Sequence, residues 1–112
     1  MASLPAVLTE LWISVASLTR SHLAALEITG RLKNVAFEQH GWQLQLRGAA
    51  GTLTLEMDPE SGRGTWTLNR TRHGTSRGQW KLKSDAMVEF TAPPASLDME
   101  LAVEQFCAML MV

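Results

Sequence analysis

The feature that most constrains the fold of this chain is an alternation of apolar and polar residues through its central part. The clearest runs are WQLQLR at 42–47 and TLTLEM at 52–57, and shorter ones follow at 65–69 and 79–83. Alternation with a period of two is typical of strands that bury one face and leave the other in water. The pattern predicts six antiparallel strands between about residues 32 and 91.

The turns between these runs test the alternation, because a slip of one residue would turn a strand's apolar face outward. Short connections at 40–41, 48–51, 59–62, 71–75 and around Asp85 keep all the apolar residues on one face. The strands should therefore form a meander, each paired with the next. The predicted neighbours on the buried face are Phe37–Leu44, Val35–Leu46, Leu46–Leu53, Leu44–Leu55, Leu55–Trp66, Leu53–Leu68, Trp66–Trp80, Leu82–Val88 and Trp80–Phe90.

Both ends of the chain carry helical periodicity instead. At residues 4–28 apolar positions recur every three or four residues, with Ser3 and Pro5 at the start and Gly30 at the stop. At residues 96–111 Ser96 is the expected N-cap, since Pro93 and Pro94 should end the sheet. The predicted buried face of the first helix is Leu4, Leu8, Leu11, Val15, Leu18, His22 and Ala25. That of the second is Met99, Ala102, Val103, Phe106 and Leu110.

These elements predict one α+β domain over residues 1–112: an N-terminal helix, a six-stranded antiparallel meander and a C-terminal helix, with both helices on one face of the sheet. The 46% hydrophobic content is enough for one core. No apolar stretch is long enough to cross a membrane, and the N-terminus lacks the basic region of a signal peptide. One cysteine allows no internal disulfide. We expect a cytoplasmic protein without membrane contact.

The sequence contains few features that would support catalysis. The three histidines occupy three different settings and no two have metal-ligand spacing. No nucleophile elbow, phosphate loop or dinucleotide fingerprint occurs. Glu100 and Glu104 share a helix face, which is typical of a solvated helix start, and Cys107 lies among apolar residues, as an inert buried thiol would. We expect no enzyme, no cofactor and no metal site.

Two features suit binding, and each has an ordinary structural alternative. His22 falls on the predicted apolar face of the first helix, where it is either a core histidine or the polar group of an apolar ligand's cavity. Residues 63–83 carry six Lys and Arg residues and no acid, whereas residues 85–112 carry five acids and no base. The hairpin of the basic block offers a candidate anion or nucleic-acid contact; the alternative is an ordinary solvated hairpin, or one that meets the acidic C-terminal region of a neighbouring subunit. The residues of that contact are Arg70, Arg72, His73 and Arg77.

The C-terminal helix is apolar on more than one side. When the core face of this helix packs on the sheet, four other apolar side chains should face the solvent. An exposed apolar patch of this kind usually marks a contact site. This candidate protein interface comprises Leu97, Leu101, Ala108 and Met111. The leading hypothesis is a non-enzymatic binding or accessory protein that works through protein–protein contacts, as a homodimer or with another protein. A nucleic-acid-binding module and a carrier of an apolar small ligand held between helices and sheet are the alternatives.

Overall fold

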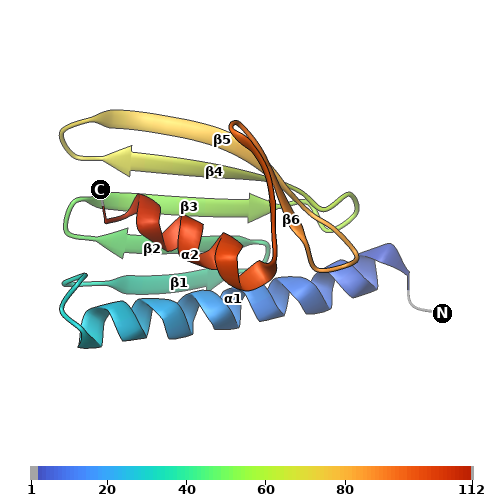
Figure 1. The fold of residues 1–112 in the computed structure, drawn as a ribbon, viewed down its shortest axis with the longest axis horizontal. Coiled ribbons are helices and arrows are strands. Elements are labelled where there is room, and N and C mark those ends of the chain that lie inside the picture. The colour runs from blue at the N-terminus through green and yellow to red at the C-terminus, as the bar shows by residue number, and fades with distance from the viewer. Residues whose placement is uncertain (1–2, 112) are drawn as a thin grey trace.

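A computed structural model of the chain describes residues 3–111. The chain runs from a long helix through a sheet to a short helix (Figure 1). All seven strands are antiparallel and lie in meander order. The elements are α1 (Leu4–Ile28), β1 (Ala36–His40), β2 (Gln43–Gly48), β3 (Gly51–Met57), β4 (Arg63–Arg70), β5 (Gly74–Leu82), β6 (Val88–Thr91), β7 (Pro94–Leu97) and α2 (Met99–Met109).

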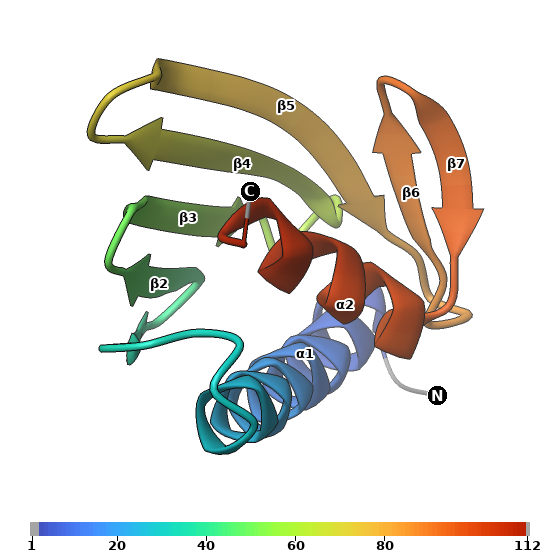
Figure 2. The same ribbon diagram turned by 60° about the vertical axis from the view of Figure 1, so that its left-hand side comes forward.

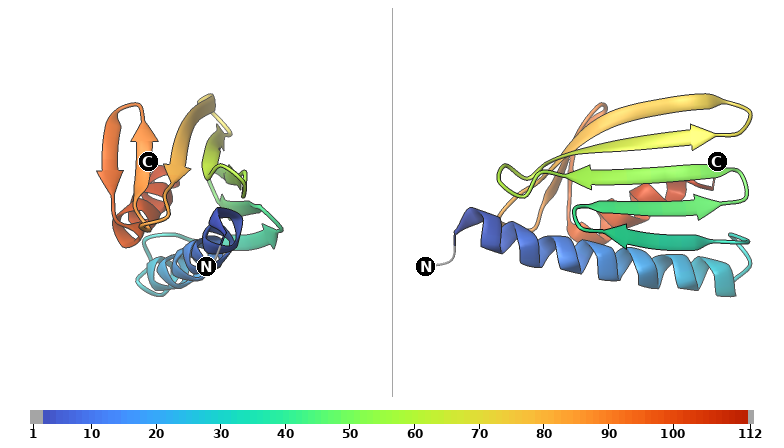
Figure 3. Two further views of the ribbon diagram at one scale, coloured as in Figure 1. Left: turned by 90° about the vertical axis from the view of Figure 1, so that its right-hand side faces the viewer. Right: turned by 180° about the vertical axis from the view of Figure 1, so that it is seen from behind.

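The predicted architecture is confirmed, except that the sheet has one strand more than expected. The sheet curves, and both helices lie on its concave side (Figure 2 and Figure 3, left). Polar residues of the strands point to the other side, which we call the outer face. α1 and α2 also contact each other, so the two helices share one core with the sheet. No helix among the described residues is long and apolar enough to cross a membrane.

The extra strand comes from the segment that was expected to end the sheet. Ala92 and Pro93, joined by a cis peptide bond, lie in a turn, and β7 then pairs back on β6, with Thr91 opposite Pro94. Proline is tolerated at the first position of an edge strand, because no ladder hydrogen bond is required there. The N-cap of α2 is consequently Asp98, whose side chain accepts from Leu101 N at 2.9 Å, and not Ser96.

Two of the predicted strand pairings are wrong, each by two residues. In the first hairpin Phe37 lies opposite Leu46 and Gln39 opposite Leu44, because the two-residue turn is Gly41-Trp42. A shift of two preserves the alternation, so the strands keep their buried faces. Trp42 itself lies in the turn and is partly exposed. The predicted pairs of β2 with β3, β3 with β4, and β5 with β6 are confirmed.

The second wrong pairing concerns the two tryptophans of β4 and β5. Trp66 lies opposite Gly78, and Trp80 opposite Gly64, so the indoles are not cross-strand partners. Each ring lies flat over the glycine facing it, where a Cβ atom would overlap the indole. Glycine at both positions therefore lets a large ring cover the neighbouring backbone, an arrangement that a Trp–Trp pair would not permit.

The core joins the helices to the sheet through a group of aromatic rings. Trp12 of α1 stacks on Trp80 with centroids 6.2 Å apart and planes 8° from parallel, and Phe106 of α2 meets Trp80 edge-on at 5.8 Å. Phe90 packs on Phe106 at 5.2 Å. Trp12 Nε1 donates to Gly41 O at 2.9 Å, whereas Trp80 Nε1 is buried without an acceptor among the described residues.

This aromatic group also explains why the predicted face of α1 is only partly right. Leu8 and Val15 are buried as expected, but the stripe runs through Trp12 rather than Leu11, since the larger ring buries more apolar area. The full buried set of α1 is Leu8, Trp12, Val15, Ala16, Thr19, Leu23 and Leu26. Leu4 is about half exposed, and Ala25 is also exposed.

Candidate functional site

His22 does not lie at the centre of the buried face of α1. It is half-buried at the edge of the stripe formed by Thr19, Leu23 and Leu26, and it does not line the three hollows described below. Thr19, the only buried polar or charged residue among residues 3–111, donates its hydroxyl to Val15 O at 2.7 Å. The hypothesis that His22 faces a cavity stays a prediction without support from these hollows.

One hollow lies between α2 and the sheet, and it is too small for a ligand. That hollow lies by Gly51, Leu68 and Leu110, and a water-sized sphere does not fit in it. Two open hollows lie instead on the outer face of the sheet, with volumes of about 700 and 570 Å³. The carrier hypothesis stays a prediction without support from these hollows.

The larger outer hollow mixes charges of both signs. Arg63 and Lys81 line it together with Glu56, Asp58 and Glu89. Lys83, two residues after Lys81, pairs with Glu89 at 3.0 Å, and this carboxylate raises the pKa of the Lys83 ammonium. Cations and carboxylates thus offset one another here. No histidine or cysteine lines the hollow, and no group of three or more potential metal ligands occurs among residues 3–111.

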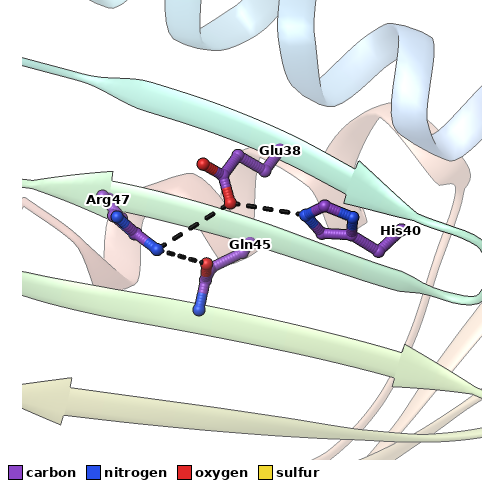
Figure 4. A network of polar contacts seen from close by, with 4 residues as sticks. All are labelled: Glu38, His40, Gln45 and Arg47. Atoms are coloured by element: carbon purple, nitrogen blue, oxygen red, sulfur yellow. Dashed lines mark hydrogen bonds and ion pairs between the residues drawn. The ribbon is translucent and has the colours of Figure 1, made fainter.

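The β1 end of the outer face is also balanced in charge. Figure 4 shows Glu38 between His40, at 3.4 Å, and Arg47, at 3.8 Å, while Arg47 also donates to Gln45 Oε1 at 2.9 Å. Glu38, His40 and Arg47 are exposed, so their pairing contributes little to stability. The cluster is an ordinary solvated network across two strands.

The four residues of the predicted anion contact have different surroundings. Arg70 is half-buried and donates to Met109 O at 3.2 Å, where it satisfies a carbonyl at the C-terminal end of α2. Arg72, His73 and Arg77 are exposed on the β4–β5 hairpin. No ion pair among residues 3–111 involves either of the two exposed arginines. The hairpin therefore keeps unneutralised positive charge.

The apolar set predicted on the C-terminal helix is also divided. Leu101 and Met111 are 48% and 42% exposed, and Ala108 is exposed beside them. Leu97 belongs to β7, where it lies opposite Val88 and packs half-buried against the core. Its assignment to the outward face of a helix is wrong, because the helix begins only at Met99.

Cys107 lies fully buried in α2. Burial raises the pKa of its thiol to about 12, and the nearby Glu104 carboxylate adds to the rise. A thiol kept protonated in this way is neither a nucleophile nor a ready metal ligand.

The feature that the sequence did not reveal is an open strand edge in the middle of the sheet. β5 pairs with β4 along residues 74–81, but β6 pairs only with Trp80, Lys81 and Leu82. Within residues 3–111, residues 74–79 of β5 thus have a neighbouring strand on one side only. In Figure 2 this part of β5 arches away from the β6–β7 hairpin. We call residues 74–79 the open edge of β5.

Backbone hydrogen bonds show which groups point to the open side. Leu82 N donates to Gly62 O toward β4, and Lys83 N donates to Met87 O toward the β6 side. Alternate residues of an antiparallel strand direct their N–H and C=O groups to opposite neighbours. Thr75, Arg77 and Gln79 therefore direct both groups to the open edge, where all three residues are exposed.

The open edge has a polar side and an apolar side. On the outer face Arg77 and Gln79 border the 570 Å³ hollow together with Thr65 and Thr67. On the concave face Ser76 and Gly78 carry little bulk, and the half-buried indole of Trp66 reaches across Gly78 toward the rim. A strand added here would meet a cation on one side and an aromatic ring on the other.

No family model, no curated protein and no solved structure matches this chain. Function must therefore be inferred from the geometry and chemistry of the chain itself.

Proposed function

We propose that this is a non-enzymatic binding protein that works through protein–protein contacts, and that it takes up an extended segment of its partner at the open edge of β5. The observation that carries the proposal is the set of unpaired N–H and C=O groups of Thr75, Arg77 and Gln79. An exposed sheet edge is a template to which another chain adds a strand.

The other edges of the sheet are less suited to such pairing. β1 carries Glu38 and His40. The Arg20 guanidinium of α1 lies 5.1 Å from the centroid of the Phe37 ring of β1, and the ribbon of α1 follows the direction of β1 in the right-hand view of Figure 3. β7 has only four residues and begins with Pro94. Short length, proline and charge are the usual means by which proteins protect sheet edges.

A photo-reactive amino acid at the open edge tests the proposal in cells that make the protein. Placed at Thr75 or Gln79, it should cross-link one contiguous segment of a partner. At Thr54, on the outer face of β3, it should not. Thr75→Pro should abolish the cross-link from Gln79, because it removes an edge N–H without removing a bond to β4. Equal cross-linking from Thr54 would contradict the proposal.

A second candidate is self-association through α2, which the exposure of Leu101 and Met111 favours. Two copies related by a two-fold axis would bury this face against itself. Sedimentation at micromolar concentration distinguishes a dimer from a monomer, and a monomer would exclude this candidate. The nucleic-acid alternative rests on Arg72, His73 and Arg77 alone, since Arg70 is engaged with α2.

A further inference from the structure

The side chains along the open edge of β5 restrict the kind of peptide segment that can bind there. We propose that its occupant is an acidic, extended peptide segment of another protein, with acidic side chains alternating with apolar ones. This inference rests on the proposed function and specifies the partner of the same site.

The acidic requirement comes from Arg77. Its side chain stands on the outer face at the middle of the open edge, and Arg72 lies exposed in the adjoining turn. Neither cation has an ion pair among the described residues, in contrast to Lys83 and Arg47 elsewhere on the sheet. In an added strand, side chains opposite Arg77 lie about 5 Å away, close enough for opposite charges to stabilise the pair.

The apolar requirement comes from the concave side. Side chains at the alternate positions of an added strand would point past Ser76 and Gly78, where the backbone carries little bulk. There they would contact the part of the Trp66 indole that projects over Gly78. Burial of an apolar side chain on this half-buried ring is favourable, whereas a charged side chain would lose its hydration there.

The same charges argue against a second copy of this chain at this edge. Two β5 edges paired about a two-fold axis would bring two Arg77 side chains close together, and would join two hairpins that carry unneutralised arginine. Like charges opposite each other on paired strands are destabilising. Arg77 therefore disfavours self-pairing of this edge and favours a partner strand of opposite charge.

Synthetic peptides test this inference by NMR. The probe is a capped nonapeptide that alternates valine and glutamate; the controls alternate valine with glutamine and valine with lysine. Titration to about 2 mM detects even a millimolar Kd. We expect the glutamate peptide to shift and protect the amides of Thr75, Arg77 and Gln79. The glutamine peptide should bind roughly two- to fivefold more weakly, as for an exposed ion pair, and the lysine peptide more weakly still.

Two variants assign the effect to the edge. Arg77→Gln should remove the preference for glutamate over glutamine, whereas Arg31→Gln, at an exposed site after α1, should leave it unchanged. Thr75→Pro should weaken the binding of all three peptides. The rest of the NMR spectrum and the circular dichroism spectrum should stay the same as in wild type.

The outcomes separate the two proposals. Equal binding of the glutamate and glutamine peptides would overturn the proposal that the partner segment is acidic, but it would still support strand addition at the open edge. No change at the three amides with any peptide would overturn both. Protection of these amides in the free protein that grows with its concentration would mean that a second copy occupies the edge. Tighter binding of a mixed-sequence DNA 12-mer to the same residues would identify the site as nucleic-acid-binding instead.

Discussion

Adding a methyl group to Gly64 or to Gly78 should have very different effects, although each glycine lies under a tryptophan. At Gly64 the new Cβ would overlap the Trp80 indole, which is 3% exposed and held between Trp12 and Phe106. Overpacking of this kind typically costs about 1–3 kcal/mol. Replacing a strand glycine with alanine also lowers the conformational entropy of the unfolded chain, which stabilises the folded state by about 0.5–1 kcal/mol. Gly64→Ala should therefore destabilise the fold by about 1–2 kcal/mol.

At Gly78 the overlapping ring is that of Trp66, which is only partly buried and can swing toward solvent. The strain is then relieved by moving one side chain, and the entropic gain offsets most of what remains. Gly78→Ala should lie within about 1 kcal/mol of wild type.

Urea unfolding followed by circular dichroism measures both variants. With an m-value of about 1–2 kcal/mol/M, the midpoint for Gly64→Ala should fall by roughly 1 M, and that for Gly78→Ala should move much less. If Gly78→Ala is as costly as Gly64→Ala, the indoles do not lie as described, and the reasoning on β4 and β5 is refuted.

Three further changes test other parts of the structure. Leu101→Asp should convert a dimer to a folded monomer in sedimentation, and a wild-type monomer would exclude the α2 interface. Cys107 should react slowly with a disulfide reagent at pH 8 unless the protein is unfolded. The pKa of the Cys107 thiol is about 12 in the folded protein, above the ordinary 9.0. As pH rises above 9, the thiol therefore ionises only in the unfolded chain, and the free energy of unfolding should fall. The Cys107→Ala variant should not show this fall in stability. Arg70→Gln should lower the free energy of unfolding by about 0.5–1 kcal/mol through loss of its bond to Met109 O. Arg72→Gln, without such a bond, should change it by less than about 0.5 kcal/mol.

The order of elements could be read from the sequence because alternation and turn positions depend on local chemistry. The register could be read only in part. A pairing slipped by two residues satisfies the alternation equally well, so Phe37 stayed on the buried face although its partner is Leu46. The choice between such registers depends on the turn and on which side chain fits over which backbone. Glycines 64 and 78 allow two indoles to lie flat, which a pattern of apolar residues does not reveal.

The candidate site was harder to foresee, because an open edge arises from a difference in length between two neighbouring strands. β5 runs over Gly74–Leu82 and β6 only over Val88–Thr91, and the position of the intervening turns sets how far they overlap. One signal was present: residues 74–79 place only Gly74, Ser76 and Gly78 on the buried face, so no large side chain there anchors a covering element. The last strand is hard to predict from the sequence, because two prolines in succession usually end a sheet.

Amide hydrogen exchange of the free protein tests the central claim, that β5 has an open edge, most directly. In β5 the amides of Thr75, Arg77 and Gln79 should exchange rapidly, whereas those of Ser76, Gly78 and Trp80, which point toward β4, should be protected. This alternation should persist on dilution. Uniform protection of residues 75–80 would show that the edge is already occupied, and uniformly rapid exchange would show that this part of β5 is not a strand; either result would contradict the account.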